Sequence, residues 1–293
     1  MNITLNQVRI FKAAAEQQSI TAAAAQLCMT QPAVSIQLKQ LEERLGQPLF
    51  EIIGKQFHLT EAGKLLLKTA IELETSLTFL YEELLSLKGG LSGTLKIGAA
   101  TSAQYFLPKL LGLFHAQYSG IALRLKIRNR AEVLQRLFSN QDDLCVVSQL
   151  PQHEGICYQQ ILDDELILVA PPDFNAQEIN QLSKLGNFPF IIREQGSGTR
   201  MAIERFFAAH NFEPKIVMEL GSAEAIIEAI YAGIGGSILP KSVLRLPLQA
   251  KYLQVLPLKE LPLPHPWYVL YLKDKRLSAV VKNFLTRIGV KLN

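Results

Sequence analysis

The sequence predicts an α+β chain of several domains, with an N-terminal winged helix-turn-helix, a long linker helix and a C-terminal α/β region of two subdomains. Three observations predict this organisation. Residues 1–60 hold short helical patterns separated by a tight turn, and residues 61–90 hold a heptad run of leucines. Residues 91–293 alternate strand and helix patterns.

The composition is that of an ordinary globular protein. Of the 293 residues, 48% are hydrophobic and 19% are charged, which supplies sizeable cores and argues against disorder. The formal net charge of +4 favours polyanionic partners only slightly. No apolar run approaches the ~20 residues of a membrane-spanning helix, and residues 1–18 lack the apolar core of a signal peptide. We therefore expect no membrane partner and a cytoplasmic location.

The first segment begins with two helices. Apolar residues at helical spacing predict one buried face on the first of them: Leu5, Val8, Phe11 and Ala15. Ser19 follows as the N-cap of a short second helix over residues 21–27.

A third helix and a hairpin complete this segment. Residues 28–30 make a tight turn, and Gln31-Pro32 opens the third helix, where proline loses no hydrogen bond. Gly46 ends that helix. The β-capable runs on either side of Gly54 predict a two-stranded wing. A helix, a short turn and a second helix form the spacing of a DNA-reading helix-turn-helix.

The second segment predicts one helix over residues 61–88. Its apolar residues step by three and four: Gly63, Leu66, Ala70, Leu73, Leu77, Leu80, Leu84 and Leu87. Such a seam fits either burial against the helix's own domain or a coiled coil with a second copy. Charged residues lie off the seam and favour the coiled coil: Glu72, Glu74, Glu82, Glu83 and Lys88. We expect dimerisation here and a break at residues 88–90.

The third segment predicts α/β structure with largely parallel sheets. Expected strands include TLKIGAA, ALRLKIR, LCVVS, ELILVAP, FPFIIRE and KIVMEL, and expected helices cover residues 103–118, 131–138 and 222–231, with another starting near Ser197. Its length predicts two subdomains with a cleft between them. We place the first at about 91–161 and 266–293, and the second at about 162–265.

Three cysteines, Cys28, Cys145 and Cys157, form no CxxC pair. They are either small buried residues in a reducing compartment, or a redox switch in which Cys145 and Cys157 approach each other in the fold.

No motif in the chain predicts catalysis. The GSGT turn at residues 196–199 lacks the spacing and lysine of a phosphate-binding loop, and no GxSxG sequence occurs. The histidines His58, His115, His153, His210 and His265 are dispersed, without the spacing of a metal site. We therefore expect no catalytic residue, no metal and no cofactor other than a small-molecule effector.

The stretch SITAAAAQLCMTQPAVSIQLKQLEERLGQPLF, followed by LTEAG, resembles the signature of LysR-type transcription regulators. The resemblance extends over the whole chain. Within the family, carbon-fixation regulators of the CbbR type are the most similar. The stretches TLKIGAATSAQYFLPKLLGLF, RNRAEVLQRL, ELILVAPPDF and IIREQGSGTRMAIERFF resemble that subfamily. The family's sensor region has a periplasmic-binding-protein-like fold, so the resemblance implies that fold for residues 91–293. A periplasmic solute receptor is a rival interpretation of that region, and the fused helix-turn-helix argues against it.

The resemblance implies that the third helix enters the major groove of DNA and that the wing contacts the flanking backbone or minor groove. By position, the DNA-binding residues are Thr30, Gln31, Pro32, Ala33, Ser35, Ile36, Lys39, Arg44 and Lys55. Gln31 can bond an adenine edge, while the lysines and Arg44 would neutralise phosphates. For Gln31 and Ser35 the alternative is a solvated helix face, and for Arg44 it is pairing with Glu42 or Glu43.

Two positions depart from the family pattern. An arginine usually follows Leu-Phe-Glu at the start of the wing, where this chain has Ile52, and a basic residue is frequent at the position of Ala22. Both changes remove contacts to phosphate or to the minor groove. We predict weak non-specific DNA affinity, supplemented by the avidity of a dimer or tetramer.

The resemblance also implies a ligand in the cleft between the sensor subdomains. The corresponding residues are Thr101, Ser102, Ala103, Asn129, Arg130, Ser148, Gln149, Gly196, Ser197, Gly198, Thr199 and Arg200. Hydroxyl groups and helix N-termini suit an anion, with Arg130 or Arg200 as the countercharge, so we expect an anionic or phosphorylated metabolite. The alternative for Ser102 and Ser197 is ordinary helix capping.

The implied mechanism is a dimer, assembling to a tetramer, that binds an inverted repeat in double-stranded promoter DNA and recruits or releases RNA polymerase. Metabolite binding would close the cleft and shift the DNA contacts. Neither the metabolite, the operator nor the sign of regulation follows from the sequence.

Overall fold

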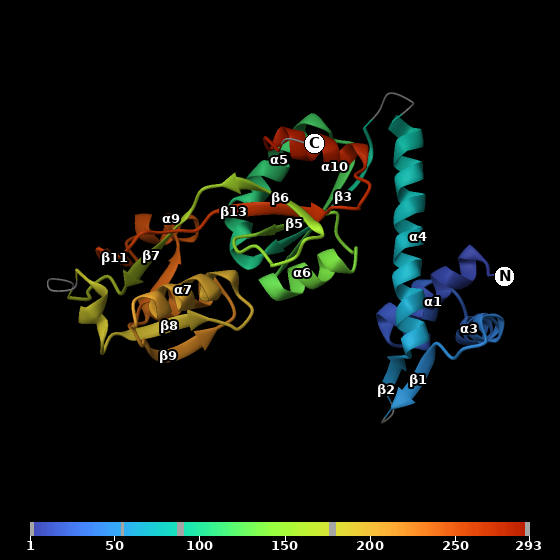
Figure 1. Ribbon diagram of the computed structural model, residues 1–293, viewed down its shortest axis with the longest axis horizontal. Helices are drawn as coiled ribbons and strands as arrows, with labels where there is room; N and C mark the ends of the chain where they lie inside the picture. The colour runs from blue at the N-terminus through green and yellow to red at the C-terminus, as the bar shows by residue number, and fades with distance from the viewer. Residues whose placement is uncertain (1–2, 54–55, 87–90, 176–179, 291–293) are drawn as a thin grey trace. The chain divides into compact units, whose positions relative to one another are not determined.

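The computed structural model describes residues 3–53, 56–86, 91–175 and 180–290. The chain divides into two compact units, Met1–Leu84 and Leu85–Asn293. Figure 1 shows the elements of each. The first unit contains α1 (Leu5–Gln17), α2 (Ile20–Gln26), α3 (Gln31–Leu45), the antiparallel pair β1 (Phe50–Ile53) and β2 (Gln56–Leu59), and the long helix α4 (Glu61–Ser86). The predicted winged helix-turn-helix and long helix are confirmed.

Side-chain caps fix where the short helices begin. Thr4 and Gln7 form a capping box on α1, Ser19 accepts from the amide of Ala22 on α2, and Thr30 accepts from the amide of Ala33 on α3. Gly46 ends α3 in the left-handed conformation, with φ 66°. These signals are local, and the sequence predicts those at Ser19 and Gly46.

The core of the first unit joins large side chains with small ones. Phe11, Val34 and Leu41 are fully buried, and alanines on α1 and α2 let the two helices approach closely. Leu5 was expected on the buried face of α1, but its side chain is 58% exposed. As the first residue of the helix, it lies where α1 borders an open groove rather than the core.

The seam of α4 divides into two parts. Near its start the helix packs on its own unit, because a Cβ atom at Gly63 would lie 2.1 Å from the carbonyl oxygen of Leu49 and Ala70 is buried. Farther along, four seam leucines are exposed: Leu73, Leu77, Leu80 and Leu84. The first part of the seam is therefore buried against the helix's own unit, and the second part is exposed. Residues 87–90, including the expected break and Leu87, lie outside the described residues.

The second unit has two sheet-based halves. The half that we call the first subdomain has a sheet of order β4-β3-β5-β13-β6, formed by β3 (Gly93–Ala100), β4 (Ile121–Arg128), β5 (Leu144–Val147), β6 (Ile156–Leu162) and β13 (Trp267–Leu272). Its helices are η1 (Thr101–Tyr105), α5 (Leu107–Gln117), α6 (Arg130–Phe138) and α10 (Ala279–Arg287). β3 is parallel to β4 and β5, while β13 is antiparallel to β5 and β6.

The half that we call the second subdomain lies between β6 and β13 in the chain. β7 (Glu165–Ala170) pairs antiparallel with β10 (Ser237–Pro240), β11 (Gln254–Leu256) and β12 (Leu263–Pro264). β8 (Pro189–Arg193) and β9 (Lys215–Leu220) pair in parallel. The helices are η2 (Leu182–Leu185), α7 (Gly198–Ala209), α8 (Ala223–Tyr231) and α9 (Lys241–Gln249).

Two expectations about this unit were wrong. Largely parallel sheets were expected, but β7 and β13 pair with their neighbours only in the antiparallel sense, because the chain crosses to the second subdomain after β6 and returns in the opposite direction on β13. The helix expected from residue 103 begins instead at Leu107, after the 3-10 turn η1, because Pro108 occupies the first turn of α5.

The register of the first subdomain's sheet shows whether Cys145 and Cys157 can form a disulfide. Cys145 faces Leu270 and Cys157 faces Tyr271, and these neighbours on β13 point to opposite sides of the sheet. The two cysteines also lie two strands, or about 10 Å, apart. They cannot form a disulfide with each other, which overturns that form of the redox switch.

Candidate functional site

The solvent face of α3 presents most of the predicted DNA-binding residues together. Gln31, Pro32, Ile36 and Lys39 are exposed, and Ala33 and Ser35 are partly exposed, while Thr30 caps the helix. The side-chain amide nitrogen of Gln31 donates to the hydroxyl oxygen of Ser35 at 3.0 Å. This bond orients the amide oxygen of Gln31 and leaves the Ser35 proton available to a partner.

Two residues in the last turns of α3 bond inside the unit. Arg44 donates to the amide oxygen of Gln7 at 2.9 Å, and Glu42 accepts from the backbone amide of Leu49 at 2.7 Å, just before the wing. On β1 of the wing, Ile52 is 75% exposed and Ile53 is 59% exposed. Lys55 lies outside the described residues.

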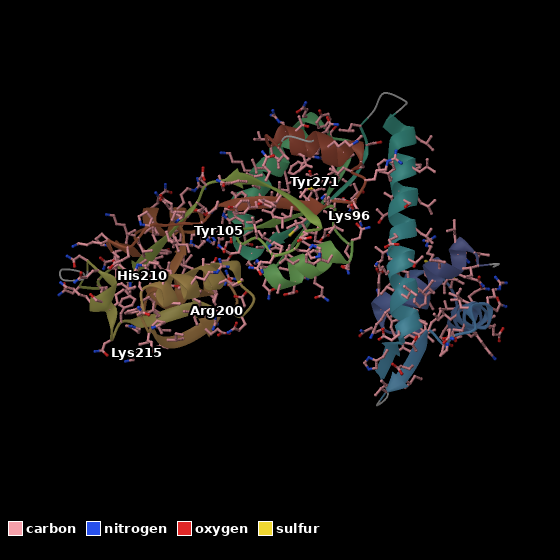
Figure 2. All side chains as sticks on the ribbon, viewed as in Figure 1. Lys96, Tyr105, Arg200, His210, Lys215 and Tyr271 are labelled. Carbon is pink, nitrogen blue, oxygen red and sulfur yellow. The ribbon has the colours of Figure 1, made fainter. Side chains whose placement is uncertain are left out.

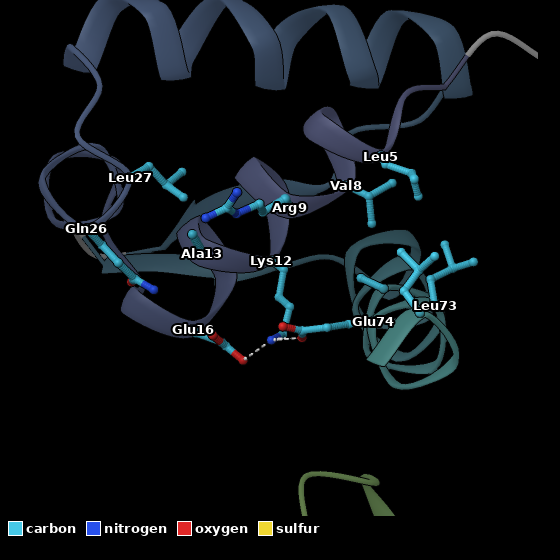
Figure 3. A pocket seen from close by; sticks show the side chains of 12 residues that line it. Leu5, Val8, Arg9, Lys12, Ala13, Glu16, Gln26, Leu27, Leu73 and Glu74 are labelled. Atoms are coloured by element: carbon cyan, nitrogen blue, oxygen red, sulfur yellow. Dashed lines mark hydrogen bonds and ion pairs between the residues drawn. The ribbon is translucent and has the colours of Figure 1, made fainter. Parts of the chain in front are cut away.

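A groove between α1 and α4, with a cavity volume of about 340 Å³, lies beside the exposed seam leucines. Its apolar lining includes Leu5, Val8, Leu73 and Leu77, as Figure 3 shows in part. Within it, Lys12 pairs with Glu16 at 3.3 Å and with Glu74. Burial lowers the pKa of Lys12, but the hydrogen bonds and charges of Glu74 and Glu16 outweigh it and raise the pKa.

A cleft in the second unit brings together residues from both subdomains. Its lining comprises Ala100, Thr101, Ser102, Asn129, Arg130, Ser148, Arg193, Ser197, Gly198, Thr199 and Trp267. Most of them stand at strand ends and helix N-termini, where an α/β fold directs backbone amide groups at a ligand. The cavity volume is about 10 Å³, roughly the space that one water molecule needs. The cleft is therefore nearly closed by its own side chains.

A contact at Gly198 shows how closely the two subdomains approach each other in this cleft. A Cβ atom on Gly198 would lie 3.0 Å from the Ser148 hydroxyl oxygen, 3.4 Å from Cδ of Arg130 and 3.6 Å from Cγ of Gln149. α7 of the second subdomain thus begins directly against the end of β5 and the Arg130 side chain of the first.

Two of the polar residues in the cleft also cap helices. Asn129 accepts from the backbone amide of Glu132 at 3.0 Å, and Ser197 accepts from that of Arg200 at 3.4 Å. Ser102 has no such role, since the N-cap position of η1 is Ala100 and Ser102 is buried within the turn. The capping alternative therefore holds for Ser197 and does not account for Ser102.

Arg130 is the cation of the first subdomain in this cleft. Its Nε donates to the backbone carbonyl of Gln149 at 2.7 Å, and no carboxylate pairs with it among the described residues. Burial lowers the pKa of Arg130, since desolvation disfavours its charged form, and the nearby Arg205 adds to this. An anion entering the cleft would relieve this cost.

Arg193, a second cation in the lining, was missed by sequence reasoning. It ends β8, and its side chain is only 3% exposed. Nε and Nη2 donate to the two carboxylate oxygens of Glu194 at 2.8 and 2.9 Å, and Nη2 also reaches the Gly221 carbonyl at 3.4 Å. Arg193 lies in the stretch IIREQGSGTRMAIERFF that carries the resemblance, but it was interpreted as the end of a strand and not as a cleft residue.

Arg200, the other expected countercharge, is held elsewhere. Its Nε donates to Glu204 at 2.7 Å and its Nη1 donates to Glu219 at 2.5 Å and to the Arg193 carbonyl at 2.9 Å. Figure 2 labels it on the second subdomain. The remaining expected residues, Ala103, Gln149 and Gly196, are not part of the lining; Ala103 is buried in the core of the first subdomain, and Gln149 accepts from Arg130 through its backbone carbonyl.

The described residues contain neither a metal-binding cluster nor a membrane-spanning helix. Among the described residues, no group of three or more His, Cys, Asp or Glu side chains is placed to hold a metal ion. In the same part of the chain, no helix is long and apolar enough to cross a membrane.

Comparison with known families identifies both units. The family described as "Bacterial regulatory helix-turn-helix protein, lysR family" matches residues 5–64, and the LysR substrate binding domain matches residues 88–290. The chain belongs to the LysR family. It is therefore a LysR-type transcription regulator, as its sequence predicted.

The similar LysR-family proteins include regulators of carbon-fixation genes. The chain is 41% identical to the HTH-type transcriptional activator CmpR of Synechocystis sp., over 97% of this chain and 94% of that protein. It is 39% identical to a RuBisCO operon transcriptional regulator of Acidithiobacillus ferrooxidans, over 96% of this chain and 92% of that protein. The predicted resemblance to carbon-fixation regulators is confirmed.

A solved structure with 37% identity shares the second unit. It is the Synechocystis PCC6803 CcmR regulatory domain in complex with 2-PG, with a TM-score of 0.64, covering 67% of this chain and 96% of that one. The comparison supports the fold of the LysR sensor unit. The roles of individual residues in the cleft and on α3 stay predictions.

Proposed function

We propose that this LysR-family regulator controls promoters of carbon-assimilation genes by sensing a short anionic metabolite in the cleft of its second unit. The observation that most supports the effector class is Arg130, a half-buried guanidinium whose Nε has only a carbonyl as its partner. Hydroxyl groups of Ser102, Ser148 and Thr199 surround the same space and offer further hydrogen bonds. The 2-PG bound by the CcmR regulatory domain is a ligand of this chemical kind.

The closed cleft gives the metabolite a means of regulation. Because the cavity holds about one water molecule, a metabolite requires the two subdomains to separate or the Arg130 side chain to move. Binding therefore selects a wider arrangement of the cleft than the one described above. A coupling of about 1–3 kcal/mol is typical of such systems and suffices to change promoter binding.

The proposed DNA-bound form is a dimer, which assembles further to a tetramer. Four exposed leucines on α4 and the apolar groove beside them suit the same seam of a second copy. Two α3 helices would then read the half-sites of an inverted repeat, about one DNA turn (~34 Å) or a multiple apart. RNA polymerase is the expected downstream partner.

Fluorescence of Trp267 tests the effector half of this proposal. The chain has one tryptophan, and it is buried in the lining of the cleft. Titration of the full chain with 2-phosphoglycolate should change its emission saturably. R130M should weaken binding at least about tenfold, the equivalent of one lost charged hydrogen bond. The matched R124M change, at an exposed position on β4, should leave binding unaltered. Equal affinities of R130M and the unaltered chain would refute the assignment.

A further inference from the structure

The cleft contains two guanidinium groups that come from opposite subdomains. Arg130 begins α6 in the first subdomain, and Arg193 ends β8 in the second. Both line the same small cavity. A ligand with one acidic group needs one cation, and this cleft supplies two.

The two arginines have different neighbours. The stem of Arg130 lies against Gly198, next to the Ser148 hydroxyl. Arg193 lies near Tyr105 of η1, because its charge acts on that phenol. Tyr105, labelled in Figure 2, also bonds Glu224 on α8, and Gln104 donates to the same carboxylate at 2.6 Å. The cations thus stand in two distinct surroundings within the cleft.

The guanidinium of Arg193 is fixed in place and still has donors to offer. Glu194 takes one edge of it in a bidentate pair, and Gly221 takes a further proton of Nη2. Among the described residues no hydrogen bond engages its Nη1. An arginine has five N–H donors, so it binds a carboxylate on one edge and a second acceptor with the remaining group. Fixing the side chain beforehand reduces the entropy lost when a ligand binds.

We propose that Arg193 is a specificity-determining residue that binds a second acidic group of the effector. This inference rests on the proposed function. The effector is then a short molecule with an acidic group at each end, such as a phosphorylated carboxylic acid. Arg130 binds one acidic group and Arg193 the other, which connects the two subdomains through the ligand.

The test uses three probes on the full chain with Trp267 emission as the readout. 2-Phosphoglycolate has both acidic groups, ethyl phosphate has only the phosphate, and glycolate has only the carboxylate. For the unaltered chain, 2-phosphoglycolate should bind about 10–100-fold more tightly than either single-acid probe, as expected for one charged hydrogen-bonding contact.

The variants separate the two cations. Two preferences are measured for each variant: the affinity for 2-phosphoglycolate relative to ethyl phosphate, and the affinity for 2-phosphoglycolate relative to glycolate. R193M should reduce one of these ratios to within about threefold, and R130M should reduce the other. R193K should retain part of the preference that R193M loses. Each preference compares two ligands on the same variant, so a partly unfolded preparation affects both affinities alike. R124M serves as the surface control.

The outcomes distinguish this inference from the proposed function. If R193M keeps both preferences, or if both variants lose the same one, Arg193 does not bind a second acidic group, even though anion sensing stands. If none of the probes changes the emission of the unaltered chain, anion sensing in this cleft fails, and the inference fails with it.

Discussion

Gly198 and Ser148 face each other across the cleft, with room for no side chain between them. A Cβ atom at residue 198 would lie 3.0 Å from the Ser148 hydroxyl oxygen, which is tighter than most real Cβ contacts. Because Gly198 begins α7 and Ser148 follows β5, this contact measures how closely the subdomains approach.

Gly198→Val should therefore open the cleft. Overpacking costs about 1–3 kcal/mol in the closed arrangement, so a ligand that needs a wider cleft should gain about 5–100-fold in affinity. Titration of Trp267 emission measures the gain. Gly186→Val is the matched control, since a Cβ atom there meets nothing within 4 Å. Unchanged affinity of the Gly198 variant would mean that the ligand binds without separating Gly198 from Ser148.

Gly63→Ala should destabilise the first unit. The new Cβ atom would lie 2.1 Å from the Leu49 carbonyl oxygen, and a backbone atom cannot move aside cheaply. We expect a loss of at least about 2 kcal/mol in the free energy of unfolding, measured by urea titration. Gly112→Ala, in open space on α5, provides the comparison. Equal stability of the two variants would contradict the packing of α4 described above.

Gln31 and Ser35 should act on DNA as a coupled pair. Each alanine substitution should cost about 1–3 kcal/mol of operator discrimination, measured as the ratio of operator to non-specific affinity. The double variant should lose less than the sum, by at least about 0.5 kcal/mol, because the two side chains share a hydrogen bond. Gln40→Ala, half a turn around α3, is the control. Strict additivity would indicate that the pair separates on DNA.

Leu77→Lys should weaken dimerisation at least about tenfold, because it would bury an unpaired charge in the proposed seam. Sedimentation of the full chain over a concentration series measures the effect. Thr78→Lys adds the same charge at the neighbouring exposed position and should leave the dimer intact. A dimer that is equally stable in both variants would exclude the α4 seam as the interface.

His265 should make the fold sensitive to acid. Its ring nitrogens are buried without a hydrogen-bond partner, and burial lowers its pKa from 6.5 to about 4, with Asp164 partly opposing the shift. Between these values the unfolded chain binds a proton that the folded chain does not. Stability is thus full above pH 6.5 and falls as the pH drops toward 4, by about 2 kcal/mol at pH 5.

Urea unfolding of the full chain at pH 7.5 and pH 5.0 tests this effect. His265→Leu, which removes the titrating group at similar volume, should lose about 2 kcal/mol less than the unaltered chain over that interval. The same pH dependence in both proteins would show that His265 takes up its proton without unfolding.

The sequence predicted the features that local chemistry decides. The cap at Ser19 and the end of α3 at Gly46 follow from residue type and spacing, and so does the heptad seam. What it missed depends on long-range contacts. Arg200 looked like a free cation at a helix N-terminus, but Glu219 of β9 binds it. Arg193 ended the expected strand FPFIIRE, and its place in the cleft depends on how the fold positions the end of β8.

The central claim, a regulator whose DNA contacts respond to an anionic metabolite, is tested most directly by a footprint. The full chain would be bound to the DNA upstream of its own gene, with and without 2-phosphoglycolate. We expect a protected inverted repeat whose boundaries change when the compound is added. Absence of protection there and on every fragment of a genomic selection would contradict the account.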